Sequence, residues 1–238
     1  MPYTLSHTVV ALPFLLSAKR KVPIAGIAVG SMSPDALYLV ALTPTGSPAN
    51  TLPGIYLFCF ICSLLVCLIW YIFIEKPTLE FLNLPQRRWR LGGNSLVLLS
   101  LAVLFGTSCH LLWDASSHIY GAFVINSEWW QQEFFSLPLY KWNQYSSGIL
   151  GLIALFLWYL YSQVKRRHKP YRGKLAIGLL IYSICIALFI FLANFIHASQ
   201  QISDYAVRSS IGLISGSVAA MCIYASVLYL QNRVRNKL

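Results

Sequence analysis

The sequence predicts an all-α, polytopic membrane protein with about six spanning helices and a short N-terminal membrane helix. Of its 238 residues, 57% are hydrophobic and 11% are charged, whereas about 25% of the residues in an ordinary soluble domain are charged. Apolar runs long enough for the roughly 20 residues that a bilayer requires recur along the chain. The basic residues gather in short clusters beside these runs, which is the positive-inside pattern of membrane proteins.

The expected spans follow one another along the chain. The first run, Thr4–Ala18, has about the length of a half-helix, and it lacks the basic start and the small-residue cleavage site of a signal peptide. The second run, Pro23–Leu42, contains Asp35 and opens with a proline where the missing N–H costs nothing. The other expected spans carry no charge: Gly54–Ile74, Leu91–Trp113, Ser146–Val164, Leu175–Ile196 and Ser209–Leu230. Together they form a single predicted transmembrane domain, in which residues 1–150 carry the motifs described below and residues 151–238 carry none.

The positions of the basic clusters predict an orientation. The net charge of +11 raises the question of nucleic acid, but bases placed beside apolar runs favour topology and contact with anionic lipid. We therefore expect membrane lipids, and no nucleic acid, as partners. The segments predicted on the cytoplasmic side are 19–21, 76–90, 165–174 and 233–237, and those predicted on the outer side are 43–53, 114–145 and 197–208. In the outer segment 114–145, residues 128–135 mix aromatic and acidic side chains, which is typical of a segment lying on the membrane surface.

The second span is predicted to break around Pro34. In the sequence Gly30-Ser-Met-Ser-Pro-Asp35, the proline removes a helical hydrogen bond and clashes with the carbonyl of Gly30. Broken backbone at membrane depth is tolerated only inside protein or beside a watery cavity. Asp35 is therefore expected to face a polar interior. The alternative is a simple proline kink with Asp35 solvated near the surface.

Five residues carry the clearest indication of chemistry: His7, Asp35, His110, Asp114 and His118. The chain has only seven acidic residues and five histidines, and an ionisable group in lipid needs a partner, a cavity or a metal. Counting helical rise from the cytoplasmic ends places the first three at ~18, ~21 and ~22–27 Å, all in the outer half of the membrane. This matched depth predicts that three distant segments converge.

The spacing of the later residues refines this expectation. His110 and Asp114 are four residues apart and share one helix face. On a continuous helix His118 would lie ~12 Å from His110, so it joins the group only if the helix ends near residues 115–117. Imidazole with carboxylate suits Zn²⁺, Fe or Mn²⁺ better than Ca²⁺ or Mg²⁺. The expected cofactor is a divalent metal, with zinc first, and individually satisfied interfacial polar groups remain the alternative.

Two further histidines are weaker candidates. His168 lies in a basic cluster that we expect to be cytoplasmic and solvated. His197 stands at the outer end of the fifth span near Asp204, where a contact behind the metal ligands is conceivable.

Four motifs resemble the bacterial DUF4184 membrane proteins. They are Met1-Pro-Tyr-Thr-Leu-Ser-His7, Gly30-Ser-Met-Ser-Pro-Asp35, His110-Leu-Leu-Trp-Asp114-Ala-Ser-Ser-His118 and Pro138-Leu-Tyr-Lys-Trp-Asn-Gln-Tyr-Ser-Ser-Gly148. That family is in turn similar to proteins assigned as membrane-bound metal-dependent hydrolases of the YdjM type, which have been likened to zinc-dependent phospholipase C and P1-type nucleases.

The resemblance implies a location and a site. It implies a multi-pass protein of the bacterial inner (plasma) membrane, with His7, Asp35, His110, Asp114 and His118 as candidate metal ligands. In the mechanism that we expect, His118 or a free carboxylate accepts the proton of a metal-activated water. This chain has Gln144-Tyr145 where the family pattern has a Gln-His pair, and it lacks the second His-x-x-x-Glu pair of the phospholipases. The resemblance therefore implies one or two ions.

The expected function is metal-dependent hydrolysis of a phosphoester or lipid-like substrate. A different class stays open: a non-enzymatic membrane protein, either a metal-binding scaffold or a small transporter. A transporter often shows paired broken helices in two halves of the chain, and the sequence has one strong break, at Pro34.

Overall fold

The computed structural model describes residues 4–16, 22–43, 52–84, 89, 94–165 and 172–235. The described chain is almost entirely helical, and six of its helices are long and apolar enough to cross a membrane. These six and the shorter apolar helix Thr4–Leu16 confirm the predicted fold class. The chain is thus a multi-pass membrane protein by length and composition of its helices.

The described elements follow in chain order. They are η1 (Thr4–Ala11), α1 (Leu12–Leu16), α2 (Ile24–Met32), η2 (Ser33–Asp35), α3 (Ala36–Ala41), α4 (Leu52–Ile69), η3 (Trp70–Ile74), α5 (Glu75–Phe81), α6 (Ser95–Ser117), α7 (Ala122–Ile125), α8 (Glu128–Gln131), β1 (Glu133–Phe134), β2 (Leu137–Pro138), α9 (Leu139–Lys165), α10 (Arg172–Ile196) and α11 (Ile202–Arg235). Here η1 and η2 are 3₁₀ helices and η3 is a π-helical turn.

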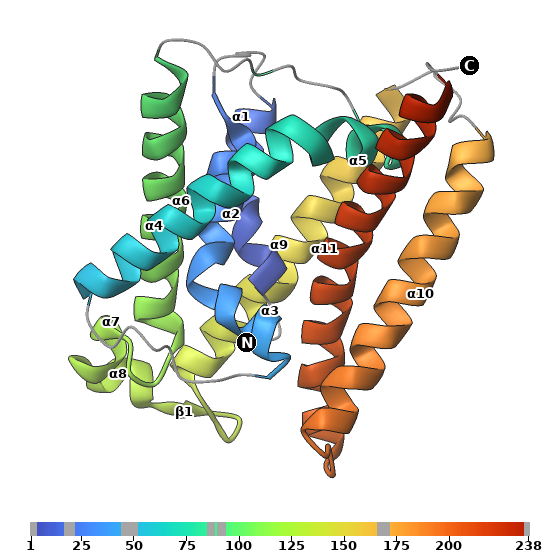
Figure 1. Cartoon of the computed structure of the whole chain (residues 1–238). Coiled ribbons are helices and arrows are strands. Elements are labelled where there is room, and N and C mark those ends of the chain that lie inside the picture. Colours follow the sequence, from blue (N-terminus) through green and yellow to red (C-terminus); the bar gives the residue numbers. More distant parts are fainter. Residues whose placement is uncertain are drawn as a thin grey trace.

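The long helices run through the molecule in alternating directions (Figure 1). The first turns of α6 and α10 and the last turns of α9 and α11 lie at one end, shown at the top, whereas α7, α8 and β1 lie at the other. This alternation is the one expected from the basic clusters. Most of the clusters themselves, at 19–21, 87–88, 90 and 166–169, lie outside the described residues.

Several spans are longer than predicted. The helix expected to end at Ile74 continues through Pro77 to Phe81. Pro77 cannot donate a helical hydrogen bond, and the π turn just before it shifts the ladder, since the N–H of Glu75 donates to the carbonyl of Trp70. The helix expected from Ser146 begins at Leu139, and in its added turns Asn143 Nδ2 donates to the carbonyl of Ser116 at 3.1 Å.

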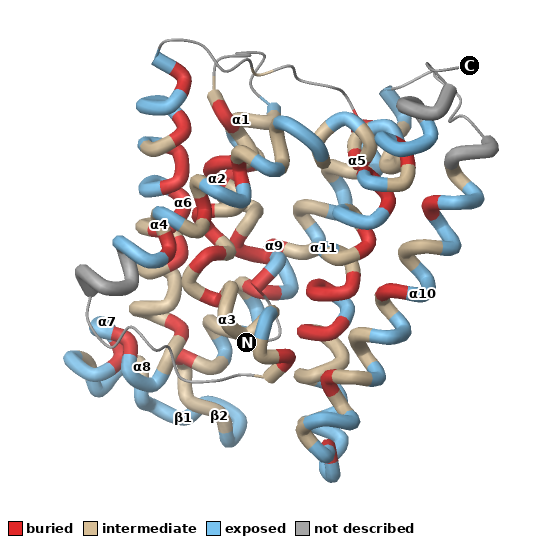
Figure 2. The backbone as a smooth tube through the Cα atoms, in the orientation of Figure 1, coloured by how far each residue is buried: buried red, intermediate tan, exposed pale blue. Residues whose placement is uncertain are grey.

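Close backbone packing joins α2 to α6. Gly30 lies so near α6 that an added Cβ would overlap the carbonyl oxygen of Val103, and a Cβ at Gly106 would overlap that of Ile27. Small residues at such positions let membrane helices approach closely. Buried residues accordingly concentrate on the facing sides of these helices and on α11 (Figure 2).

The last two helices form a hairpin that touches the rest of the chain mainly through α3, η3 and α5. Within the hairpin, Gly212 and Gly216 face the backbone of α10, where an added Cβ would come within 2.8 Å of Ile190 Cα and 2.7 Å of Ile186 Cα, respectively. Ser215 Oγ donates to the carbonyl of Leu39 at 2.7 Å. The hairpin therefore anchors the helix that follows the break at Pro34.

The outer segment folds as two short helices and a two-stranded hairpin between α6 and α9. The turn of the hairpin places Phe135 and Ser136 at positive φ. Large apolar side chains point outward here, with Phe134 58% and Phe135 81% exposed. The placement of these rings on a membrane surface remains a prediction.

Candidate metal centre

The α-helix of the second span is interrupted at Pro34, as predicted. The 3₁₀ turn Ser33–Asp35 replaces α-helix, and the carbonyl of Gly30 accepts the N–H of Ser33 instead of the missing N–H of Pro34. The same carbonyl also accepts Ser33 Oγ at 2.8 Å and Thr107 Oγ1 at 3.1 Å. Hydroxyl groups commonly satisfy backbone that a proline frees in a membrane helix.

Asp35 points inward from this turn. The residue is only 2% exposed, so the alternative of a carboxylate solvated near the surface is wrong. Its Oδ2 accepts a hydrogen bond from Thr4 Oγ1 at 2.7 Å. Its Oδ1 lies 3.8 Å from Nε2 of His110 on α6. The break therefore places a buried carboxylate at the contact between α2 and α6.

His110 is fixed by the backbone of the same break. Its Nδ1 lies 2.6 Å from the carbonyl oxygen of Ser31, and a carbonyl can only accept, so Nδ1 carries a proton. A histidine that ligates a metal usually donates its other N–H in this way. Nε2 therefore faces the site, and the imidazole is 1% exposed.

Two carboxylates converge on His110 Nε2. Asp114 Oδ2 lies 3.1 Å away and Asp35 Oδ1 3.8 Å away. A bare lone pair on Nε2 would face two negative oxygens at these distances, which is electrostatically unfavourable in a buried place. The arrangement needs a positive charge, supplied either by a second proton on His110 or by a metal ion.

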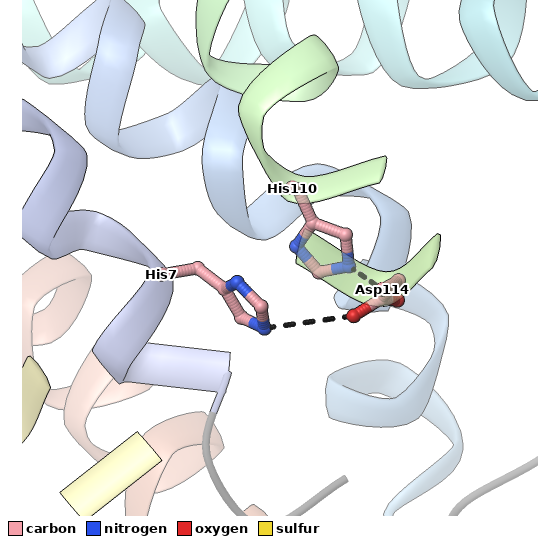
Figure 3. A group of neighbouring side chains, drawn as sticks. All are labelled: His7, His110 and Asp114. Atoms are coloured by element: carbon pink, nitrogen blue, oxygen red, sulfur yellow. Dashed lines mark hydrogen bonds and ion pairs between the residues drawn. The ribbon is translucent and has the colours of Figure 1, made fainter. Parts of the chain in front are cut away.

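His7 completes the group from the N-terminal 3₁₀ helix. Its ring lies against that of His110, with centroids 4.1 Å apart, and against the edge of Trp113 at 5.0 Å. Its Nε2 is 3.9 Å from Asp114 Oδ1, too far for a hydrogen bond. Among the described residues, His7 Nδ1 and Asp114 Oδ1 are buried without a hydrogen-bond partner. Figure 3 shows the three side chains pointing toward one another from η1 and α6.

The donor atoms fit a divalent ion in kind and nearly in distance. One ligand atom each from His7, His110 and Asp114 lies within 4.8 Å of the others. Ligands at about 2.0–2.2 Å from a tetrahedral ion lie ~3.4 Å apart. Side-chain shifts of about 1 Å close the difference. Asp114 Oδ1, which is buried without a hydrogen-bond partner among the described residues, is an atom that an ion would satisfy. Asp35, held by Thr4, approaches the same nitrogen of His110, Nε2, at 3.8 Å.

His118 joins the group because α6 ends at Ser117. The residue leaves the helix with extended backbone, and its N–H closes the last turn on the carbonyl of Asp114. Its Nδ1 lies 3.3 Å from Asp114 Oδ1. The chain then folds back so closely that a Cβ at Gly121 would overlap the carbonyl oxygen of Ala115. The condition predicted for His118, a helix end near 115–117, is met.

A small hollow opens beside this group. It is lined by Ser6, His7, Trp113, Ser117, His118, Gln144 and Gly148. Trp113 Nε1 donates to Ser147 Oγ on α9 at 3.0 Å, which fixes the indole as one wall. The site is therefore reached from the side of η1, α6 and α9.

All five predicted residues are brought together, and His197 is not. His197 Nε2 donates to the carbonyl of Ala41 at 2.8 Å, so it holds the end of α3 instead. His168 lies outside the described residues. The sequence did not identify Thr4 and Gln144 as site residues, although both lie inside the quoted motifs.

The comparisons with known proteins add one match. A family model described as "Domain of unknown function (DUF4184)" matches residues 1–229. The match includes the α10–α11 hairpin, in which no motif was found. No curated protein and no solved structure matches the chain.

Proposed function

The chain belongs to the DUF4184 family, and we propose that it is a membrane-embedded, metal-dependent hydrolase acting on a phosphoester or lipid-like substrate. His7, His110 and Asp114 would hold a divalent ion, with zinc expected first, and Asp35, 3.8 Å from His110 Nε2, would share the ion. The observation that carries the proposal is His110, whose Nδ1 is bound to the Ser31 carbonyl while Nε2 faces two carboxylates.

The residues around the ion have distinct tasks in this proposal. When bound, such an ion polarises a phosphoryl oxygen and lowers the pKa of water. His118, beside both Asp114 and the hollow, accepts the proton that the attacking water loses. Trp113 and His7 exclude bulk water from one side, because their rings pack edge to face.

A lipid-like substrate fits the position of the site. Ser117, His118 and Gln144 line the hollow where α6 and α9 adjoin the segment between them, in which Trp129 is 55%, Phe134 58% and Phe135 81% exposed. Aromatic rings favour the headgroup region of a bilayer. We expect this segment to lie on the outer surface of a bacterial inner membrane, and the kinship with YdjM-type hydrolases is part of the same proposal.

Hydrolysis of a phosphodiester reporter tests the function. The purified wild-type protein, stripped of metal and reloaded with Zn²⁺ or Mn²⁺ in lipid micelles, should cleave the reporter. His110→Ala and Asp114→Ala should abolish cleavage and binding of the ion together. Asp204→Ala removes a carboxylate at the outer end of α11 and should change neither. Binding of the ion without cleavage would instead favour a metal-binding scaffold, and absence of both would favour a small transporter.

Cysteine labelling tests the proposed orientation. Ser127→Cys, in the outer segment, should react with an impermeant maleimide added to intact cells. Arg88→Cys, in a predicted cytoplasmic cluster, should react only after the cells are opened. The reverse pattern would overturn the orientation and with it an outward-facing site.

A further inference from the structure

A chain of polar contacts leads from Lys141 through Gln144 to His118. We propose that Gln144, oriented by Lys141, is a positioning residue that keeps the proton of His118 on Nδ1 and the lone pair on Nε2. This inference rests on the proposed function, in which His118 accepts a proton. Its geometry comes from contacts on α9 that the metal ligands do not share.

Lys141 decides which way the Gln144 amide points. Lys141 Nζ lies 3.2 Å from Gln144 Oε1. An ammonium group has only donors, so the atom that it contacts is the amide oxygen. The ammonium is also held over the rings of Tyr140 at 5.6 Å and Tyr145 at 5.9 Å. Cation–π contacts on two sides keep it in place.

The amide nitrogen then faces His118. Gln144 Nε2 lies 3.2 Å from His118 Nε2. An amide NH₂ can only donate, so His118 Nε2 accepts and carries no proton. In the neutral ring the proton therefore sits on Nδ1.

The contacts of the other ring nitrogen, Nδ1, independently indicate the same tautomer. His118 Nδ1 lies 3.1 Å from Ser117 Oγ and 3.3 Å from Asp114 Oδ1. A lone pair on Nδ1 would face a carboxylate oxygen, whereas an N–H there is attracted to it. Contacts on both nitrogens thus select the same tautomer.

This tautomer suits a proton acceptor. The basic nitrogen, Nε2, faces Gln144, and both side chains line the hollow, where a water molecule would enter. A carboxylate beside the Nδ1 proton stabilises the imidazolium formed when Nε2 takes a proton, as in catalytic triads. Gln144 thereby sets the tautomer of the base through its hydrogen bond to Nε2.

Replacement of Gln144 by glutamate reverses the contact. An ionised carboxylate only accepts, so Gln144→Glu should draw the proton of His118 onto Nε2. Solid-state ¹⁵N NMR of histidine-labelled protein in bilayers, at about pH 8 and so above the ordinary histidine pKa of about 6.5, reports the tautomer directly. Subtraction of the His118→Asn spectrum assigns the signal. Gln132→Glu, the same change at an exposed position, is the matched control.

We expect the proton on Nδ1 in the wild type and in Gln132→Glu, and on Nε2 in Gln144→Glu. In the same variant kcat should fall about 10–100-fold, the range for residues that orient a site, while KM stays within about 2-fold. If Gln144→Glu fails to fold, Lys141→Met provides a second route, because it frees the amide to rotate and should give a mixture of both tautomers.

A wild-type His118 with its proton on Nε2, or a tautomer unchanged in both variants, would overturn the inference. The NMR result does not depend on activity. A protein that shows the expected tautomers but neither binds metal nor hydrolyses the reporter would therefore retain the contact chain and lose the proposed function.

Discussion

The α2–α6 contact and the α10–α11 contact both pack through glycines, but only the first lies at the candidate metal centre. Both bring helices together through glycines four residues apart, Gly26 and Gly30 in one and Gly212 and Gly216 in the other. In the α10–α11 hairpin, a described side-chain hydrogen bond joins the two helices near their connection, where Asn194 Nδ2 donates to Ser209 Oγ at 3.0 Å. In the α2–α6 contact, a proline break turns backbone carbonyls toward polar side chains at the centre.

This difference between the two contacts shows why only one helix pair gathers polar groups that could bind a metal. Glycine packing alone brings backbones close, but an intact helix keeps its carbonyls in its own hydrogen-bond ladder. Only the break at Pro34 presents the carbonyls of Gly30 and Ser31 to Thr107 and His110. We therefore expect changes in the α2–α6 contact to affect metal binding, and matched changes in the hairpin to affect stability alone.

The largest effect is expected from Gly30→Ala. The new methyl group would overlap the carbonyl of Val103, push α2 from α6 and separate Asp35 from His110. The cost is about 1–3 kcal/mol of stability, together with loss of metal binding. Gly216→Ala meets Ile186 Cα at 2.7 Å and should cost a similar amount, yet retain the metal. Thermal unfolding together with metal analysis distinguishes the two variants. Loss of metal in Gly216→Ala would contradict the expected difference between the two contacts.

A smaller effect is expected from Asp35→Asn. The asparagine can still accept the hydrogen bond from Thr4 Oγ1, so the turn should stay intact. Because the asparagine carries no charge, His110 Nε2 then faces one carboxylate instead of two. Metal affinity should fall about 10–100-fold. Titration with a competing chelator measures this. Asp204→Asn is the control, and an equal loss there would point to a general effect of net charge.

The smallest effects come from single hydroxyl groups. Thr107→Val and Ser215→Ala each remove one donor to a backbone carbonyl, that of Gly30 or of Leu39. Each should cost about 0.5–1.5 kcal/mol. Only Thr107→Val should weaken metal binding, because Gly30 belongs to the break. If Ser215→Ala weakens it equally, the hairpin also tunes the site through α3.

The sequence predicted the spans and the convergence for identifiable reasons. Hydropathy fixes where a membrane helix lies, and matched depth fixes which polar residues meet, as His7, Asp35 and His110 do. Helix ends were less predictable. Leu139 begins α9 a full two turns before the apolar run, because the polar side chains there contact protein. The π turn at Trp70–Ile74 has no signal except the proline that follows it.

The finer geometry of the site lay beyond the sequence. The place of His118 depends on the backbone angles of one residue after α6, φ −124° and ψ 147°. The part played by Gln144 depends on a contact with His118 across 26 residues of chain. Neither follows from periodicity, since both are set by how the chain folds back at Gly121.

Metal analysis of purified protein tests the central claim most directly. Wild type, Asp114→Ala and Asp204→Ala, purified without chelator and measured by inductively coupled plasma mass spectrometry, give the ion content per chain. The account predicts a stoichiometric divalent ion in the wild type and in Asp204→Ala, and its loss in Asp114→Ala, which removes a ligand and the partner of His110 Nε2. A wild-type protein that remains free of metal after incubation with Zn²⁺ and Mn²⁺ would contradict it, and a protonated His110 between two carboxylates would then explain the cluster.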